Sequence, residues 1–119
     1  MPRFVVLEHD HPDVHWDLML ESDEILTTWS LPPQPLPLRE FQCSTKRLPD
    51  HRKRYLDYEG DVSDGRGAVR RIDAGTFDQL DEQRFALYGA LFDGTLELRT
   101  DFCVFAMRKA RKSEKMQKQ

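Results

Sequence analysis

The chain has 119 residues, with 18 lysines and arginines against 21 aspartates and glutamates, which gives a formal net charge of −3. That length fits a single domain, and a hydrophobic content of 39% is enough for a packed core. No apolar run approaches the roughly 18 residues that cross a membrane, and the N-terminus becomes charged too early for a signal peptide. We therefore expect a cytoplasmic protein. The acidic balance argues against a generic nucleic-acid binder, whose surface is usually basic.

Short stretches of alternating apolar and polar residues dominate the sequence, and long stretches with helical periodicity are missing. Turn residues such as Ala74-Gly75 separate these stretches. Eight strands are predicted in chain order, at Arg3–His9, His15–Glu21, Ile25–Leu31, Arg39–Thr45, Ala68–Asp73, Arg84–Tyr88, Thr95–Thr100 and Phe102–Arg108. Helix is expected only as a turn or two within Leu48–Leu56 and in the C-terminal tail. This pattern predicts a mostly β protein, a small closed or partly open antiparallel β-barrel with one or two short helices.

Two segments interrupt the alternation. Pro32–Pro37 contains four prolines and is interpreted as a stiff crossover between strands, although a polyproline ligand for a partner domain is the alternative. Residues 108–119 hold six basic residues and one acidic residue, a net charge of +5, so the rest of the chain carries −8. We expect a barrel domain over residues 1–109 and a basic tail over 110–119. The tail either adds salt-sensitive affinity for phosphates or only keeps the chain soluble.

Two further motifs are interpreted as structural. Cys43 and Cys103 lie far apart without a Cys-x-x-Cys spacing, so they indicate neither a zinc knuckle nor a disulfide framework, and both are predicted to be buried thiols. The glycine-containing segment 64–67 does not precede a helix, which is the context of a phosphate-binding loop. It is therefore predicted to be a hairpin turn.

The histidines cluster near the N-terminus, with His9, His11 and His15 inside seven positions. Alternation along the strand that begins at His15 places His15 and Asp17 on one face, opposite an apolar face. A tight turn at Pro12 would return His9 beside them. Two imidazoles and one carboxylate from adjacent strands can form an open site for a divalent metal such as Mn²⁺, Zn²⁺ or Fe²⁺. The alternative is a polar hairpin with surface histidines, and His11 is expected to be exposed.

A second cluster of functional side chains lies between Lys46 and Tyr55. Arginine side chains bind phosphate oxygens with two parallel hydrogen bonds, and His51 or Tyr55 could donate a proton or hydrogen bond to a phosphoryl oxygen. A solvated basic loop is the alternative. The basic members are Lys46, Arg47, Arg52, Lys53 and Arg54.

These motifs occur in a recognisable order. The spacing His-x5-His-x-Asp of His9, His15 and Asp17 is followed by several shorter matches, at Trp29–Pro32, Asp50-His51 with Tyr55, Asp57–Gly60, Gly75–Phe77 and Phe85–Gly89. In this order the sequence resembles the 3′-phosphoesterase domain family of bacterial DNA ligase D, over residues 3–109 and as a short stand-alone member.

The resemblance implies a compact β-barrel and a Mn²⁺-dependent phosphoesterase that trims the 3′ ends of DNA or DNA–RNA in end joining. It would remove 3′-phosphates and 3′-terminal ribonucleotides, and Zn²⁺ or Co²⁺ could replace Mn²⁺. By matching position, His9, His15 and Asp17 would hold the metal. His51 would contact or protonate the scissile phosphate, with Tyr55 beside it. A separate DNA ligase or polymerase could recruit the protein, which we expect to be a monomer without a membrane partner.

The sequence also departs from the family pattern. Met19 stands where the family has an arginine on the ligand strand, and Pro33 or Gln34 replaces a family lysine. Arg47, Arg52 or Arg54 could supply the missing positive charge. The candidates for binding phosphate or nucleic acid are Lys46, Arg47, Arg52 and Arg54.

Two alternatives remain at this point. A barrel without the family arginine and lysine could be a catalytically degenerate module that binds nucleic-acid ends or proteins in a repair assembly. A set of two histidines and one carboxylate is also typical of non-haem iron enzymes, although the sequence identifies no pocket for an organic co-substrate.

Overall fold

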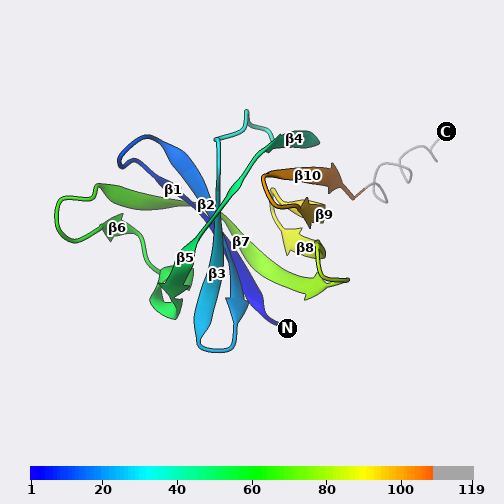
Figure 1. Cartoon of the computed structure of the whole chain (residues 1–119), viewed down its shortest axis with the longest axis horizontal. Helices are drawn as coiled ribbons and strands as arrows, with labels where there is room; N and C mark the ends of the chain where they lie inside the picture. Colours follow the sequence, from blue (N-terminus) through cyan, green and yellow to red (C-terminus); the bar gives the residue numbers. More distant parts are fainter. Residues whose placement is uncertain (109–119) are drawn as a thin grey trace.

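The computed structural model describes residues 1–108, which form ten strands and one short 3-10 helix (Figure 1). Their bounds are β1 (Arg3–His9), β2 (His15–Ser22), β3 (Ile25–Leu31), β4 (Phe41–Ser44), β5 (Lys46–Arg52), η1 (Lys53–Leu56), β6 (Gly60–Asp61), β7 (Ala68–Gln79), β8 (Arg84–Gly89), β9 (Asp93–Leu98) and β10 (Phe102–Met107). The predicted tail and its helix lie outside these residues. Within residues 1–108, no helix has the length and hydropathy needed to span a membrane.

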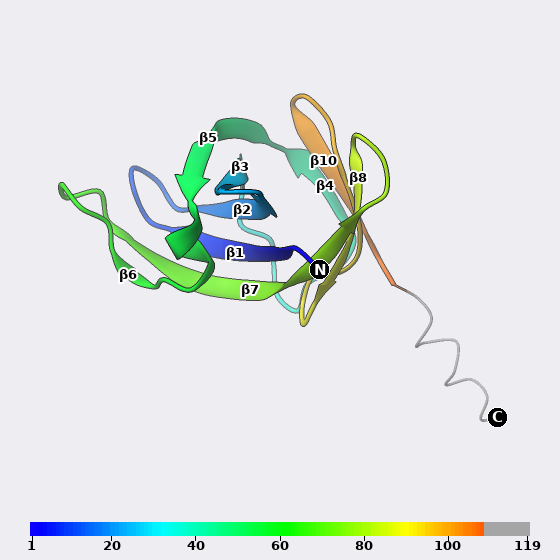
Figure 2. The same cartoon turned by 90° about the horizontal axis from the view of Figure 1, so that it is seen from below.

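The strands form one antiparallel sheet in the order β4-β10-β9-β8-β7-β1-β2-β3-β5, with β6 beside β7. The two edge strands, β4 and β5, are consecutive in the chain and are joined through Thr45. The Thr45 backbone N–H donates to the Asp101 carbonyl at 3.0 Å, and the Thr45 hydroxyl donates to the Ser30 carbonyl at 2.9 Å. One residue therefore binds both ends of the curved sheet. Figure 2 shows the resulting partly open barrel, which confirms the predicted fold class.

Strand β7 is longer than predicted and passes through the expected turn at Ala74-Gly75. It pairs with β1 along most of its length and with β8 from Gly75 onward. A Cβ atom at Gly75 would lie 2.2 Å from the carbonyl oxygen of Tyr88. The turn prediction was wrong because a glycine inside a strand can also permit close backbone approach.

The helical turn predicted within Leu48–Leu56 is present as η1, whereas strand β5, which was not predicted, occupies the rest of that segment. Pairing with β3 shifts register between Leu26 and Thr28, so β5 contains a bulge there. Pro49 lies in this bulge, where the proline's missing N–H costs no ladder hydrogen bond. A proline near the middle of a strand therefore hid β5 from the sequence pattern.

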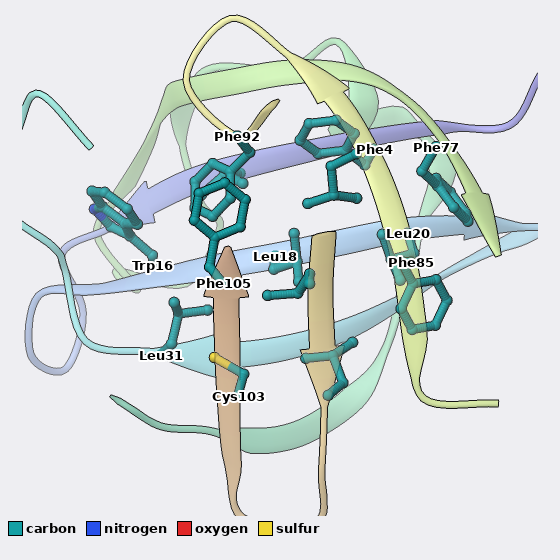
Figure 3. Packing of buried hydrophobic residues seen from close by; sticks show 14 of the residues in the cluster. Phe4, Trp16, Leu18, Leu20, Leu31, Phe77, Phe85, Phe92, Cys103 and Phe105 are labelled. Atoms are coloured by element: carbon teal, nitrogen blue, oxygen red, sulfur yellow. The ribbon is translucent and has the colours of Figure 1, made fainter. Parts of the chain in front are cut away.

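Apolar side chains cover both faces of β1 and β2. The larger cluster fills the barrel, where Figure 3 shows aromatic rings converging from the strands, as Phe4, Trp16 and Phe105 do, and from the loop after β8, which contributes Phe92. The smaller cluster lies on the opposite face of β1 and β2, with η1 contributing Leu56; its buried members are Val5, Leu7, Met19, Leu26, Leu56 and Val69. The face of β2 that carries His15 and Asp17 is therefore continuous with a second core.

Two smaller predictions also have an outcome in the structure. Pro32–Pro37 lies in the connection from β3 to β4, which are not neighbours in the sheet, as expected for a crossover. Cys43 and Cys103 are direct partners across β4 and β10, with their sulfur atoms 3.8 Å apart. Cys103 is buried as predicted, whereas Cys43 is half-buried.

Asp73 gives the first testable prediction, because its buried carboxylate organises the loop after β8. It accepts three backbone hydrogen bonds, from Ala90 at 3.1 Å, Leu91 at 3.0 Å and Phe92 at 2.7 Å. Asp73→Ala should lower the free energy of unfolding by about 3 kcal/mol in urea titrations, since three donors lose a charged acceptor. The matched variant Asp78→Ala removes an exposed carboxylate from the same strand and should cost no more than about 0.5 kcal/mol. Equal losses would contradict this role.

Candidate metal centre

The hairpin of β1 and β2 places the three predicted ligands together. His9 and His15 are direct partners at the end of the hairpin that adjoins the turn, and Leu7 is the partner of Asp17. Because side chains alternate along a strand, His9 shares the face of Leu7, and His15 shares the face of Asp17. The three side chains therefore extend the smaller apolar cluster toward the turn between the strands.

The ligand atoms of His9, His15 and Asp17 lie within 4.8 Å of one another. His15 Nε2 is 3.1 Å from Asp17 Oδ1, and His9 Nδ1 is 3.7 Å from Asp17 Oδ2. The side chain of Asp17 is 3% exposed, against 17% for His9 and 20% for His15. The carboxylate thus forms the floor of the site, and the two imidazoles line its partly open rim.

Backbone carbonyls fix which ring nitrogen of each histidine faces the carboxylate. His9 Nε2 donates to the Arg66 carbonyl at 2.8 Å, and His15 Nδ1 donates to the Asp13 carbonyl at 2.8 Å. A carbonyl only accepts, so each of these nitrogens carries the proton in the neutral ring. The remaining nitrogens, Nδ1 of His9 and Nε2 of His15, keep their lone pairs and point at Asp17. Metal-binding histidines in proteins are oriented by such contacts to the other ring nitrogen.

The ionised carboxylate of Asp17 should destabilise the folded protein at this position unless a cation is bound. Its Oδ1 atom is buried and has no hydrogen-bond partner among residues 1–108, because the nearby His15 Nε2 offers a lone pair. Burial raises the pKa of the Asp17 carboxyl above its ordinary value. When the rings carry a positive charge, those of His15, His9 and His51, in decreasing order, lower the pKa of this carboxyl and offset part of the rise. A divalent cation such as Mn²⁺, Zn²⁺ or Co²⁺ fits two directed lone pairs and one buried carboxylate oxygen.

His51 acts electrostatically on the Asp17 carboxyl from the same face of the sheet. His51 is the β5 partner of Leu26, a member of the smaller cluster, and therefore faces the same side of the sheet as Asp17. His51 Nδ1 donates to the Pro49 carbonyl at 2.9 Å, which leaves Nε2 as the atom available to a substrate. The Tyr55 ring lies 5.8 Å from the His51 ring, edge to face.

The basic candidates are divided between the two faces of the sheet. Lys46 is the partner of Ser30, which is in turn the partner of Asp17, so Lys46 lies on the metal face at the same level. Arg47 is the partner of Trp29, which packs against the larger cluster, and its guanidinium lies 5.0 Å from the Trp29 ring. Of this pair, only Lys46 therefore lies on the face of the sheet that carries the candidate ligands.

Arg52 and Arg54 lie farther along the chain. Arg52 is exposed at the end of β5, opposite Ile25. The Arg54 guanidinium lies over the rings of Tyr58, at 4.5 Å, and Tyr55, at 5.8 Å. Arg54 therefore borders the aromatic side chains next to His51, whereas Arg52 lies at the level of Ile25, away from Asp17.

Met19, which stands where the family pattern has an arginine, is part of the core. The side chain is 1% exposed and belongs to the smaller apolar cluster, between its β1 partner Val5 and its β3 partner Thr28. A charged side chain at this position would have to leave the cluster or be buried. The methionine stabilises the core beneath the site and offers nothing to a phosphate.

The sequence analysis missed the groups that orient the ligands. The carbonyls of Asp13 and Arg66 are backbone atoms, so no residue type marks them. The nearest signal was the glycine-containing turn at 64–67, which was interpreted as a hairpin alone. It is a hairpin between β6 and β7, and it also contacts a candidate ligand.

Comparison with known proteins identifies the family of this chain. The profile of the DNA ligase D 3′-phosphoesterase domain matches residues 7–118, a span that includes all the candidate ligands. The multifunctional non-homologous end joining protein LigD of Pseudomonas aeruginosa is 32% identical over 88 residues, which cover 71% of this chain and 10% of that protein. The chain thus spans about a tenth of the length of this relative. It belongs to the DNA ligase D 3′-phosphoesterase domain family.

Proposed function

We propose that this chain is a divalent-metal-dependent phosphoesterase that removes 3′-phosphates and 3′-terminal ribonucleotides from DNA or DNA–RNA ends in end-joining repair. The observation that carries the proposal is that two imidazole nitrogens face the two oxygens of one buried carboxylate, of which Oδ1 has no hydrogen-bond partner among residues 1–108. Membership of a phosphoesterase family supports it, as does a relative named for non-homologous end joining. Ligase and polymerase activities that act on the same ends are the proposed partners.

The proposed metal is Mn²⁺, held by His9 Nδ1, His15 Nε2 and the Asp17 carboxylate. When bound, such an ion polarises a phosphoryl oxygen and lowers the pKa of water. The protein's own contribution is to keep both lone pairs directed inward and to hold the carboxylate out of water. A phosphate could reach the site from the solvent side, because both imidazoles are partly exposed.

His51 and Lys46 are proposed to act on the phosphate itself. His51 Nδ1 is committed to the Pro49 carbonyl, so a second proton on this ring would lie on Nε2; from there it can pass to an oxygen that leaves phosphorus, which leaves the imidazole neutral. Tyr55 packs against the His51 ring and limits its orientations. Lys46 supplies positive charge on the metal face at the level of Asp17. This charge would replace that of the family arginine, whose position is occupied by Met19.

Met19 favours a second candidate function. Its burial in the core removes the family arginine without a replacement on the same strand. A barrel that keeps the metal but lacks this charge could bind a DNA end without hydrolysing it. This alternative predicts binding without product.

A primer–template assay separates the two functions. DNA ending in a 3′-phosphate, or in one 3′-ribonucleotide, is incubated with the protein and Mn²⁺, Zn²⁺ or Co²⁺, and the products are resolved on a denaturing gel. The enzyme should release phosphate with Mn²⁺ and form no product when EDTA is present. If the protein binds the DNA ends but forms no product with any of the three metals, the result would contradict the phosphoesterase proposal and support a binding module.

A further inference from the structure

The turn between β6 and β7 lies against the turn between β1 and β2, next to His9. Figure 2 shows the two turns extending from the same side of the barrel. Asp10 joins them through two hydrogen bonds to one residue. Its Oδ1 atom accepts from the Ala68 backbone N–H at 2.8 Å, and its own backbone N–H donates to the Ala68 carbonyl at 3.3 Å. Asp10 therefore fixes the distance between the turns immediately after a candidate metal ligand.

Gly67 is the residue that permits this contact. A Cβ atom there would lie 2.2 Å from Asp10 Oδ1 and 2.7 Å from the Cβ atom of His11. Its φ of +76° is also in the left-handed region that favours glycine. Gly65, two residues earlier, has a similar φ of +67°, but a Cβ atom there would meet no atom of residues 1–108 within 4 Å. Both glycines ease the turn, and only Gly67 is needed for close approach.

The contact determines the position of the Arg66 carbonyl, which lies between the two glycines. This carbonyl accepts the hydrogen bond from His9 Nε2 at 2.8 Å. The Arg66 side chain contributes elsewhere, because its Nε atom donates to the Ser63 carbonyl within the turn. The backbone of the turn, and not the guanidinium, therefore acts on His9.

We propose that Asp10 and Gly67 form a clasp that holds the Arg66 carbonyl against His9 Nε2 and so directs His9 Nδ1 into the metal site. They are positioning residues, since neither lies among the ligand atoms. The inference rests on the proposed function for its connection to catalysis. Its structural content is the hydrogen bond from His9 Nε2 to the Arg66 carbonyl and the ring tautomer that this bond selects, which can be observed without metal or substrate.

Two glycine variants give a matched test. Gly67→Ala and Gly65→Ala introduce the same side chain at similar backbone strain, but only the first disrupts the clasp. Gly67→Ala should weaken Mn²⁺ binding, measured by calorimetry, by about 10- to 100-fold, the usual cost of losing a group that orients a ligand. Gly65→Ala should bind within about twofold of the wild type. Saturating Mn²⁺ should restore the turnover number of Gly67→Ala. Equal affinities for the two variants would overturn the proposal.

Asp10 variants keep the test decisive if Gly67→Ala does not fold. Asp10→Asn retains an oxygen acceptor for the Ala68 N–H and should bind Mn²⁺ nearly as the wild type does, whereas Asp10→Ala should lose about tenfold in affinity. In Gly67→Ala and Asp10→Ala, ¹⁵N NMR of the metal-free protein should show that His9 is no longer held in the single tautomer with the proton on Nε2. An unchanged His9 signal would overturn the clasp. A wild type that binds Mn²⁺ without hydrolysing DNA would contradict only the proposed function.

Discussion

Asp17→Asn should abolish Mn²⁺ binding and at the same time make the metal-free protein more stable at neutral pH. The carboxylate is buried, and its Oδ1 atom lies 3.1 Å from the lone pair of His15 Nε2. An asparagine amide can turn its NH₂ group toward that nitrogen and form a hydrogen bond. The gain should be on the order of 1 kcal/mol, because an unpartnered buried charge is replaced by a satisfied neutral group.

The pH dependence of the free energy of unfolding should show whether the Asp17 carboxylate destabilises the metal-free protein. Burial raises the pKa of the Asp17 carboxyl in the folded protein, so the folded state binds this proton more tightly than the unfolded chain does. The free energy of unfolding of the metal-free protein therefore falls as pH rises from about 4 through that raised pKa. Asp17→Asn cannot lose this proton and should lack that part of the decline. Metal binding reverses the balance for the wild type, since it requires the ionised carboxylate.

Thermal unfolding with and without Mn²⁺ measures both halves of the prediction. At a concentration one hundred times its dissociation constant, Mn²⁺ should stabilise the wild type by about 2.7 kcal/mol and leave Asp17→Asn unchanged. Without metal, the variant should unfold at a higher temperature than the wild type. A variant that is less stable without metal, or that still responds to Mn²⁺, would contradict the role assigned to Asp17.

His51→Gln should separate catalysis from metal binding. Glutamine can still form hydrogen bonds but cannot transfer a proton, so the turnover number for 3′-phosphate release should fall by about 10²- to 10⁴-fold. Mn²⁺ affinity should stay within about twofold, because His51 Nδ1 is bonded to Pro49 and the ring is not among the three ligands. Steady-state kinetics and calorimetry on the same preparation give both values.

His11 offers the control for this variant. Its ring lies 6.4 Å from the His9 ring, and the residue is exposed on the turn. His11→Gln should therefore leave both turnover and Mn²⁺ affinity within about twofold of the wild type. Equal effects of the two substitutions on turnover, or a parallel loss of Mn²⁺ binding in His51→Gln, would remove His51 from the chemistry.

The β1–β2 hairpin could be predicted because the alternation along the strands and the turn residue both indicate the same structure. Period-2 alternation put His15 and Asp17 on one face, and Pro12 marked the turn that returns the chain beside His9. Ligand spacing along two paired strands is a local property, so the sequence alone carries it. The antiparallel barrel followed from the number of short strands in the same way.

The remaining parts of the site depend on pairings between distant segments. The level of Lys46 relative to Asp17 is fixed by the β3–β5 register, which a bulge at Pro49 shifts. Likewise, the Arg66 carbonyl reaches His9 across 57 residues of sequence. Backbone carbonyls and bulges leave little trace in residue type, so these features could be read only from the folded chain.

The central claim is that His9, His15 and Asp17 hold one divalent metal, with the imidazole nitrogens already fixed by the backbone. Diffraction data collected at the manganese absorption edge, from crystals grown with MnCl₂, test it directly. The account predicts one anomalous peak bonded to His9 Nδ1, His15 Nε2 and the Asp17 carboxylate, and no such peak in His15→Ala crystals. A peak bonded to the opposite nitrogen of either ring, or manganese bound only at other residues, would contradict it.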